Sequence, residues 1–189
     1  MRIIAISGKA GAGKNTVAKM LHDIDPNYTI ISFGDKLKEI CSSLTSIPVH
    51  HWEQRKFKEQ HQDRLGCSGR EYMVRIGQAL RNADPDILIK ALFADLPAHR
   101  KYIIADARTC AELEAVKLYG GTVIRIERIG LETGNDITET ELDCYPYFDY
   151  TVQNNSSLSN LFFRVLNIQQ LIAAQAAKPF WQQRAIQIL

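Results

Sequence analysis

Short apolar runs alternate with longer amphipathic segments along this chain. Five apolar runs have the length expected of buried strands: Ile3–Ser7, Thr29–Phe33, Tyr102–Asp106, Thr122–Ile126 and Tyr150–Gln153. Segments between them show helical composition or spacing, which predicts helices over Thr16–Leu21, Asp35–Leu44 and Ala111–Tyr119. Continuous apolar strands separated by helices indicate an α/β protein, with a mostly parallel sheet and helices on both faces.

The segment that follows Asn154–Ser157 is predicted to form a last long helix. Apolar residues recur there at helical spacing, so we expect them to form one buried stripe. This stripe consists of Leu158, Leu161, Phe162, Val165, Ile168, Leu171 and Ile172.

Two long segments interrupt the alternation of strand and helix. Residues 45–100 separate the second and third strands and are mostly helical and polar, whereas residues 127–149 separate the fourth and fifth strands. Segments of this length outside a compact sheet usually bind ligands or form lids, although both could be insertions without a role. No Pro/Gly-rich linker divides the chain, so we expect a single domain over residues 1–189.

Charge and cysteine content narrow the class of protein. The formal net charge of +2 disfavours a general binder of nucleic acid or of anionic membranes. The four cysteines form no CxxC pair, and the first strand runs into a glycine-rich loop instead of a signal-peptide cleavage site. We therefore expect reduced thiols in a cytoplasmic protein, as a monomer or a homodimer.

The sharpest motif is the loop after the first strand. Its sequence matches G-x-x-x-x-G-K between a strand and a helix. Glycines let successive backbone N–H groups point into one concavity, which the positive end of the following helix also faces, and Lys14 adds a charge between the β- and γ-phosphates. We assign the phosphates of ATP to Gly8, Ala10, Gly11, Ala12, Gly13, Lys14, Asn15 and Thr16.

The position after Lys14 departs from the general motif. Asn15 stands where serine or threonine usually binds Mg²⁺, and Thr16 follows it. This arrangement resembles the variant found in nucleoside monophosphate kinases. The resemblance implies that Thr16 contacts a phosphate and that Mg²⁺ is held largely through waters, with Asn15 as a direct ligand being the alternative.

Two further segments resemble the phage-type deoxynucleoside monophosphate kinase family. Ser32–Lys38 is similar to the family's Phe-Ala-Asp-x-Leu-Lys segment, with Gly34 in place of alanine. Ser68–Arg81 is similar to its Pro-Arg-Glu…Gly…Arg helix, with Gly69 in place of proline.

The resemblance continues through the second half of the chain. Ile104–Ile126 is similar to the family's Asp-x-Arg…Glu…Gly-Gly…Ile-Arg-Ile stretch. Thr140-Glu141 and Val152–Asn154 stand where the family has a Ser-Glu pair and an asparagine after a strand. The matches therefore cover most of the chain in the family's order.

The resemblance implies a three-layer P-loop fold with a five-stranded parallel sheet in the order 2-3-1-4-5. It also implies phosphoryl transfer from ATP, with Mg²⁺, to a (deoxy)nucleoside monophosphate, which gives ADP and a diphosphate. Residues 45–100 would then bind the acceptor, and residues 127–149 would form a lid. A kinase for another small acceptor, such as a dephospho-coenzyme or a sugar acid, is one alternative, and a nucleotide-binding module without catalysis is another.

One predicted helix carries the residues assigned to the acceptor phosphate. At about 100° per residue, Arg70, Gly77 and Arg81 fall within about 20° of one line. Two arginines flanking a glycine offer bidentate donors and a close backbone approach, as a phosphate monoester needs, although a solvated basic face is the alternative. The core side of this helix should consist of Met73, Ile76 and Leu80.

Charged residues near the strand ends complete the acceptor and metal assignments. Asp106 ends the third strand and could hold a Mg²⁺-bound water together with Thr16, or it could cap the next helix. Arg108 could reach the acceptor. Asp35 and Lys36 are also assigned to the acceptor, with helix capping as the alternative for Asp35.

The lid segment supplies a candidate catalytic arginine. Arg128 is preferred to Arg125, because Arg125 lies within a strand. An arginine at this point can neutralise charge on the transferred group, although a surface role is the alternative. The catalytic assignments are therefore Lys14, Asp106 and Arg128.

Histidines and a cysteine in the 45–100 segment form a competing candidate. His50, His51, His61 and Cys67 match no recognised zinc spacing, and the residues between them are rich in Lys, Arg, Glu and Gln. We interpret this stretch as a polar helical segment.

Overall fold

The computed structural model describes residues 1–131 and 142–177. Much of the expected lid, including Thr140-Glu141, therefore lies outside the described residues. The chain divides into two compact units, one of Met1–Ile30 with the residues from His99 onward, and one of Ile31–Ala98. We call them the sheet unit and the helical unit.

The sheet unit contains the glycine-rich loop and the main sheet. Its described elements are β1 (Arg2–Ser7), α1 (Lys14–Ile24), β2 (Tyr28–Ile31, which ends at the unit boundary), β5 (Lys101–Ile104), α6 (Cys110–Leu118), β6 (Thr122–Glu127), β7 (Tyr150–Gln153) and α7 (Leu158–Ala177).

The five strands form one sheet in the order β2-β5-β1-β6-β7. β1 pairs in parallel with both β5 and β6, and β6 pairs in parallel with β7. In chain order, β1, β2, β5, β6 and β7 are the first to fifth strands of this sheet. The observed order is therefore 2-3-1-4-5, which confirms the prediction. The glycine-rich loop thus follows the central strand.

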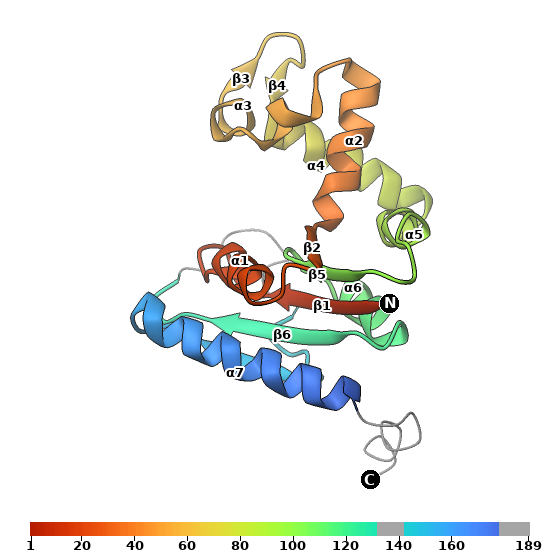
Figure 1. Ribbon diagram of the computed structural model, residues 1–189. Coiled ribbons are helices and arrows are strands. Elements are labelled where there is room, and N and C mark those ends of the chain that lie inside the picture. Colours follow the sequence, from red (N-terminus) through yellow and green to blue (C-terminus); the bar gives the residue numbers. More distant parts are fainter. Residues whose placement is uncertain (132–141, 178–189) are drawn as a thin grey trace. The chain divides into compact units, whose positions relative to one another are not determined.

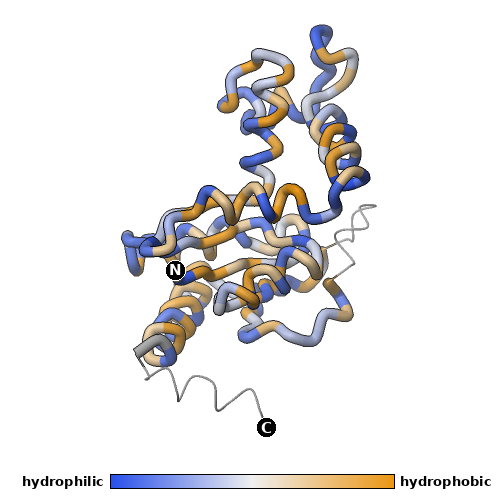
Figure 2. Tube along the Cα trace, turned by 90° about the vertical axis from the view of Figure 1, so that its right-hand side faces the viewer, coloured by the Kyte–Doolittle hydropathy of each residue, from blue (hydrophilic) through white to orange (hydrophobic). Residues whose placement is uncertain are grey.

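Helices cover both faces of this sheet (Figure 1). α1 and α7 pack against each other and share one core with strand residues such as Ile4, Ile6 and Ile124. α6 packs on β1 and β6 through Leu113 and Val116, which are fully buried. Because both faces are covered, consecutive positions of β1 and β5 are buried, which explains their continuous apolar runs (orange in Figure 2).

The predicted stripe on α7 is only partly buried. Leu161, Val165, Ile168 and Ile172 are buried, and on a helix they fall within an arc of about 60°. The other three predicted members flank this arc and are exposed, with exposed fractions of 67% for Leu158, 37% for Phe162 and 45% for Leu171. The prediction was wrong for these three, because α7 contacts the rest of the unit along a narrow line. No helix in the described part of the chain is long and apolar enough to cross a membrane.

The helical unit consists of short elements. They are α2 (Phe33–Thr45), the 3-10 helix η1 (Val49–Glu53), α3 (Arg55–Glu59), β3 (His61–Gln62), β4 (Cys67–Ser68), α4 (Gly69–Ala83) and α5 (Ile87–Ala94). The β3–β4 hairpin was not predicted, because two-residue strands leave no periodic signal.

Trp52 forms the centre of the helical unit. It is fully buried with Cys41 and Ile47, and its Nε1 donates to the carbonyl of Ile47 at 3.1 Å. Met73 and Ile76 of α4 pack against this cluster, as their predicted face requires. Their contact confirms the orientation expected for this side of α4.

Candidate phosphate site

The loop after β1 has a backbone that only glycine adopts readily at two key positions. Gly8 has φ 145° and Gly13 has φ 103°, both in the left-handed region. A Cβ on Gly8 would lie 2.4 Å from the carbonyl oxygen of Ile126, and a Cβ on Gly13 would lie 2.5 Å from Nδ2 of Asn154. The loop therefore curls tightly against the ends of β6 and β7.

The Lys14 ammonium lies within this curl. Its Nζ donates to the carbonyl of Gly8 at 2.6 Å and to the carbonyl of Lys9 at 3.0 Å. Lys14 is the first residue of α1, and no acidic residue stands in the first turn of that helix. Its charge thus adds to the positive end of the α1 dipole.

The other predicted phosphate residues lie around the same loop. Ala12 is buried, and its backbone N–H donates to the carbonyl of Lys9 at 3.1 Å. Ala10 and Gly11 are exposed at the rim of the loop, and Asn15 and Thr16 are exposed in the first turn of α1. This surface can offer backbone N–H groups and a hydroxyl to phosphate oxygens.

A hollow beside the loop gathers four cationic side chains. Lys9 and Lys14 come from the loop and the start of α1, Arg108 comes from the segment before α6, and Arg125 comes from β6. No carboxylate of the described residues lines this hollow, whose remaining walls are Ser7, Gly8, Ala107 and Leu142. We call it the phosphate hollow, because four cations around one hollow suit a multiply charged anion.

A second hollow adjoins the first. The two share Lys9 and Arg125. The second hollow has an apolar wall and a polar wall. The apolar wall consists of Ala12, Ile126, Ile129 and Leu131, and the polar residues beside it are Glu127, Arg128 and Gln153. A hollow that combines apolar walls with amide and charged groups is suited to a nucleoside.

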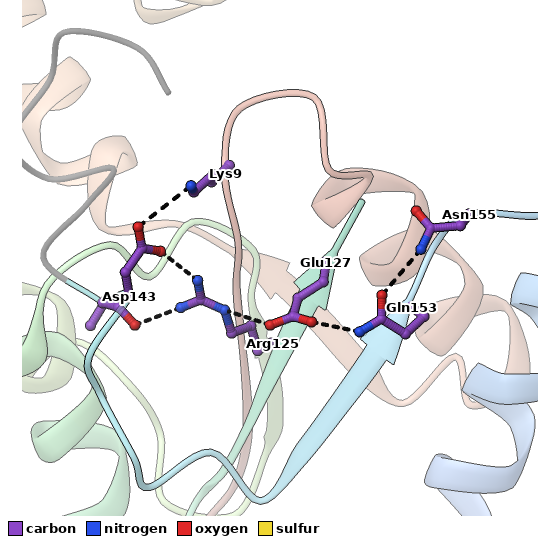
Figure 3. A network of polar contacts seen from close by, with 7 residues as sticks. Lys9, Arg125, Glu127, Asp143, Gln153 and Asn155 are labelled. Carbon is purple, nitrogen blue, oxygen red and sulfur yellow. Dashed lines mark hydrogen bonds and ion pairs between the residues drawn. The ribbon is translucent and has the colours of Figure 1, made fainter. Parts of the chain in front are cut away.

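Arg125, which the sequence analysis ranked below Arg128, lies where the two hollows meet. Its guanidinium donates to the carbonyl of Leu142 at 2.6 Å and to Asp143 Oδ1 at 2.6 Å, and its Nε lies 3.2 Å from Glu127 Oε1 (Figure 3). It lines both hollows, whereas Arg128 is exposed and lines only the second. The available signal was its position near the carboxyl end of a strand beside β1, where α/β proteins bind ligands.

Asp106 lies just beyond the carboxyl end of β5 and is half-buried. It does not cap the next helix: the N-cap of α6 is Thr109, whose hydroxyl accepts from the N–H of Glu112 at 3.2 Å. The capping alternative is therefore wrong for Asp106. Neither Asp106 nor Thr16 lines the phosphate hollow, so their assignment to Mg²⁺ stays a prediction.

The helical unit holds the residues predicted for the acceptor. Asp35 Oδ2 accepts from the N–H of Ser32 at 2.8 Å as part of a capping box, and Lys36 Nζ lies 2.5 Å from Asp95 Oδ2. Capping is therefore confirmed for Asp35. Because of this capping box, α2 begins at Phe33, which the sequence analysis had assigned to the end of the second strand. Arg70 and Arg81 are exposed on α4, as their predicted stripe requires.

Gly77 lets Arg81 lie close to the α4 backbone. Gly77 is buried, and a Cβ there would lie 3.2 Å from Leu37 Cδ2 and 3.4 Å from Nη1 of Arg81. The guanidinium therefore rests beside the glycine on the same stripe. This contact agrees with the predicted placement of Gly77 and Arg81 on one stripe of the helix.

Two lysines beside Arg70 were missed by sequence reasoning. Lys38 is mostly buried, with its Nζ 2.7 Å from Asp35 Oδ1 and 3.5 Å from Glu53 Oε1. Burial lowers the pKa of Lys58, and the nearby charges of Lys38 and Arg70 lower it further. Among the described residues the Lys58 ammonium has no hydrogen bond or ion pair, so this cation is available to an anion.

Two histidines of this unit, His50 and His51, make ring contacts. The rings of His50 and His51 are 4.3 Å apart between centroids, and His51 meets Phe57 edge-on at 6.2 Å. Within residues 1–131 and 142–177, no group of three or more His, Cys, Asp and Glu residues could hold a metal ion.

Comparisons with known proteins give distant likenesses of fold. No protein-family model and no curated protein sequence matches the chain. Among solved structures it is similar to shikimate kinase from Aquifex aeolicus (16% identity, 92% of this chain and 99% of that chain, TM-score 0.45). It is also similar to shikimate kinase from Acinetobacter baumannii in complex with shikimate (15% identity, 94% of this chain and 95% of that chain, TM-score 0.48). A third match is an unliganded sugar kinase from Janibacter sp. (12% identity, 92% of this chain and 96% of that chain, TM-score 0.42). Likenesses at these values identify no substrate for this chain.

Proposed function

We propose that this protein transfers a phosphoryl group from ATP to a (deoxy)nucleoside monophosphate. The observation that carries the proposal is the phosphate hollow, where Lys14 lies within a tight glycine loop at the start of α1. Three further cations line the same hollow, namely Lys9, Arg108 and Arg125. Such an arrangement supports a multiply charged phosphate chain.

The donor nucleotide would span the two adjoining hollows. Its phosphates would lie in the phosphate hollow, and its nucleoside would pack against Ile126, Ile129 and Leu131 in the second hollow. Mg²⁺ would be held by the phosphates and by waters on Thr16 and Asp106. When bound, this ion would neutralise charge on the transferring group.

In this reaction the protein would position the two substrates and neutralise the charge of their phosphates. Phosphoryl transfer passes through a state with charge spread over the phosphoryl oxygens, and little covalent chemistry is left to side chains. Lys14 and the N–H groups of the loop would orient the donor phosphates. Arg108 and Arg125 would stabilise the charge that develops during transfer.

The acceptor phosphate would bind on the helical unit. Arg70 offers a planar, bidentate donor, and Lys58 offers a half-buried ammonium without a described partner. Lys38 adds a third charge, which Asp35 and Glu53 partly neutralise. That the acceptor is a nucleotide rests on the family resemblance of this helix and of the Ser32–Lys38 segment.

An acceptor panel tests the proposal. ATP and Mg²⁺ are supplied with each common ribo- and deoxyribonucleoside monophosphate, and separately with a sugar acid and a dephospho-coenzyme. We expect ADP and a matching diphosphate in stoichiometric amounts with at least one monophosphate. Transfer only to the phosphate-free or coenzyme acceptors would contradict the nucleotide assignment, and transfer to none would indicate a non-catalytic module.

A further inference from the structure

A carboxylate that belongs to neither hollow holds the two cations that the hollows share. Asp143 Oδ1 accepts from Nη2 of Arg125 at 2.6 Å, and Asp143 Oδ2 lies 3.4 Å from Nζ of Lys9 (Figure 3). Lys9 comes from the phosphate loop and Arg125 from β6, so Asp143 links two elements of the site. Any phosphate chain that spans both hollows must pass the same two cations.

Asp143 is ionised at neutral pH and is poorly held by other groups. The hydrogen bond from Arg125 keeps the pKa of Asp143 below its ordinary value, and the charge of Lys9 acts in the same direction. Among the described residues, Lys9 and Arg125 are its side chain's only partners. Its side chain is 37% exposed, so it can turn into solvent when an anion arrives.

The other carboxylate on Arg125 is held differently. Glu127 Oε2 accepts from Gln153 Nε2 at 2.5 Å, and Gln153 Oε1 accepts from Asn155 Nδ2 at 3.1 Å. Asn155 in turn accepts from the N–H of Ile129 at 2.7 Å, which fixes this chain of contacts to the backbone. Glu127 is thus fixed in the wall of the second hollow, whereas among the described residues the Asp143 side chain contacts only the two cations.

Arg125 keeps an anchor when Asp143 leaves. Its Nη1 donates to the carbonyl of Leu142, and its guanidinium lies over the ring of Phe148 at 5.3 Å from the centroid. Asp149 accepts from the N–H of Val123 at 2.7 Å and so fixes the end of this segment on β6. An incoming phosphate can therefore replace the Asp143 carboxylate without releasing the guanidinium.

We propose that Asp143 is an internal competitor of the nucleotide phosphates, which occupies Lys9 and Arg125 in the free protein and takes them back when the nucleotide leaves. This inference rests on the proposed function, because it requires nucleotide phosphates in the phosphate hollow. The exchange trades one carboxylate for a phosphate chain of higher charge, which the loop and Lys14 also hold. Asp143 thus lowers the affinity for nucleotide and eases the release of ADP.

Removing the competing charge should tighten phosphate binding. The test measures dissociation constants for ADP and for inorganic pyrophosphate by titration calorimetry, with the wild type and Asp143→Asn. Losing each of the two partly exposed ion pairs should lower the dissociation constant a few-fold. We therefore expect both ligands to bind about tenfold tighter to the variant. A merely structural role for Asp143 predicts the opposite sign, because a loosened Arg125 would bind phosphate more weakly.

Two controls separate local competition from a general effect of charge. Asp23→Asn makes the same change of charge at an exposed position of α1, and it should leave both affinities within about twofold, because surface charges at a distance are screened. In an Arg125→Met background, Asp143→Asn should give less than half of its effect on the binding free energy. If Asp143→Asn does not fold, Asp143→Ser should show the same gain.

Each outcome decides the inference. Equal or weaker binding of ADP by Asp143→Asn, or an equal gain in Asp23→Asn, would overturn it while leaving the proposed function intact, provided that Lys14→Met loses ADP binding. If the wild type binds neither ADP nor pyrophosphate, the proposed function fails and the inference fails with it.

Discussion

Asn154, which follows the edge strand β7, holds the phosphate loop through Ala12. Its Nδ2 donates to the carbonyl of Ala12 at 2.8 Å and lies 2.5 Å from the place where a Cβ on residue 13 would stand. The backbone N–H of Asn154 donates to the carbonyl of Glu127 at 2.7 Å, which ties the same residue to β6. Gly13 therefore has two constraints, a left-handed backbone and a close neighbour.

We predict that Gly13→Ala weakens both stability and nucleotide binding. The left-handed backbone costs an alanine about 1–2 kcal/mol, and the added methyl displaces Asn154 from the loop. Unfolding by urea should show a loss of about 2 kcal/mol. ATP affinity, measured by calorimetry, should fall at least tenfold.

Gly120→Ala is the matched control for this strain. Gly120 also has a positive φ, of 69°, but nothing lies within 4 Å of its Cβ position. This variant should lose about 1 kcal/mol of stability and keep the wild-type affinity for ATP. A similar loss of ATP affinity in both variants would show that the Asn154 contact does not shape the phosphate loop.

Arg70→Ala should impair use of the acceptor and spare the donor. A charge-assisted hydrogen bond to a phosphate is worth about 1.5–3 kcal/mol, so acceptor kcat/KM should fall about 10- to 150-fold. The KM for ATP should stay within about twofold. Lysine at this position should restore only part of the loss, because an ammonium cannot bind two phosphate oxygens in one plane.

Arg75 gives the internal comparison for Arg70. It lies on the same helix, about 140° away from Arg70, and is exposed. Steady-state kinetics of Arg75→Ala should match the wild type for both substrates. An equal effect of the two substitutions would place the acceptor phosphate elsewhere.

Gly77→Ala should separate acceptor binding from stability. Alanine gains about 1 kcal/mol of helix propensity, which offsets the crowding of Leu37 at 3.2 Å. The same methyl would lie against Nη1 of Arg81, at 3.4 Å, on the stripe where the acceptor phosphate is proposed to bind. Acceptor KM should therefore rise several-fold while the unfolding free energy changes by less than about 1 kcal/mol. A large loss of stability with an unchanged acceptor KM would contradict the position assigned to Arg81.

The Asp35 capping box should make stability depend on pH. Burial opposes ionisation of this carboxyl, but hydrogen bonds from Lys38 and Ser32 outweigh it and hold its pKa below the ordinary value. Because the folded pKa is lowered, the contribution is fully present above the ordinary pKa, about 4, and is lost as the pH falls through the folded pKa.

Asp35→Asn isolates this charge. The side chain is 41% exposed, so we expect a discounted loss of about 0.5–1 kcal/mol at pH 7. Urea unfolding from pH 7 to pH 3 should show the difference between wild type and variant constant above about pH 5 and shrinking below about pH 4. A difference that stays constant to pH 3 would contradict the contribution of the ionised carboxylate.

The sequence predicted those features that local chemistry determines. The loop from Gly8 to Lys14 is encoded by adjacent residues, and the sheet order followed from the pattern of runs together with the family resemblance. The stripe of Arg70 and Arg81 is likewise set by helix geometry alone.

Features that depend on distant contacts were not predicted. Arg125 gains its place in the site from Leu142 and Asp143, and Lys58 gains its place from the packing of α3 against α4. The exposure of Leu158 depends on how small a part of the α7 surface contacts the rest of the sheet unit. Leu158 and Leu161 have the same apolar side chain, but only Leu161 is buried. No local pattern carries this information.

Transfer of labelled phosphate tests the central claim most directly. ATP labelled in the γ-phosphoryl group is incubated with Mg²⁺ and the best monophosphate of the acceptor panel, with the wild type and with Lys14→Met. The label should appear in the terminal phosphate of a nucleoside diphosphate with the wild type, and at least 100-fold more slowly with the variant. Lys14→Met should stay folded and lose about 1–2 kcal/mol of stability, because the ammonium also binds the carbonyls of Gly8 and Lys9. Release of the label only as inorganic phosphate, or equal transfer by both proteins, would contradict a nucleotide kinase built on this loop.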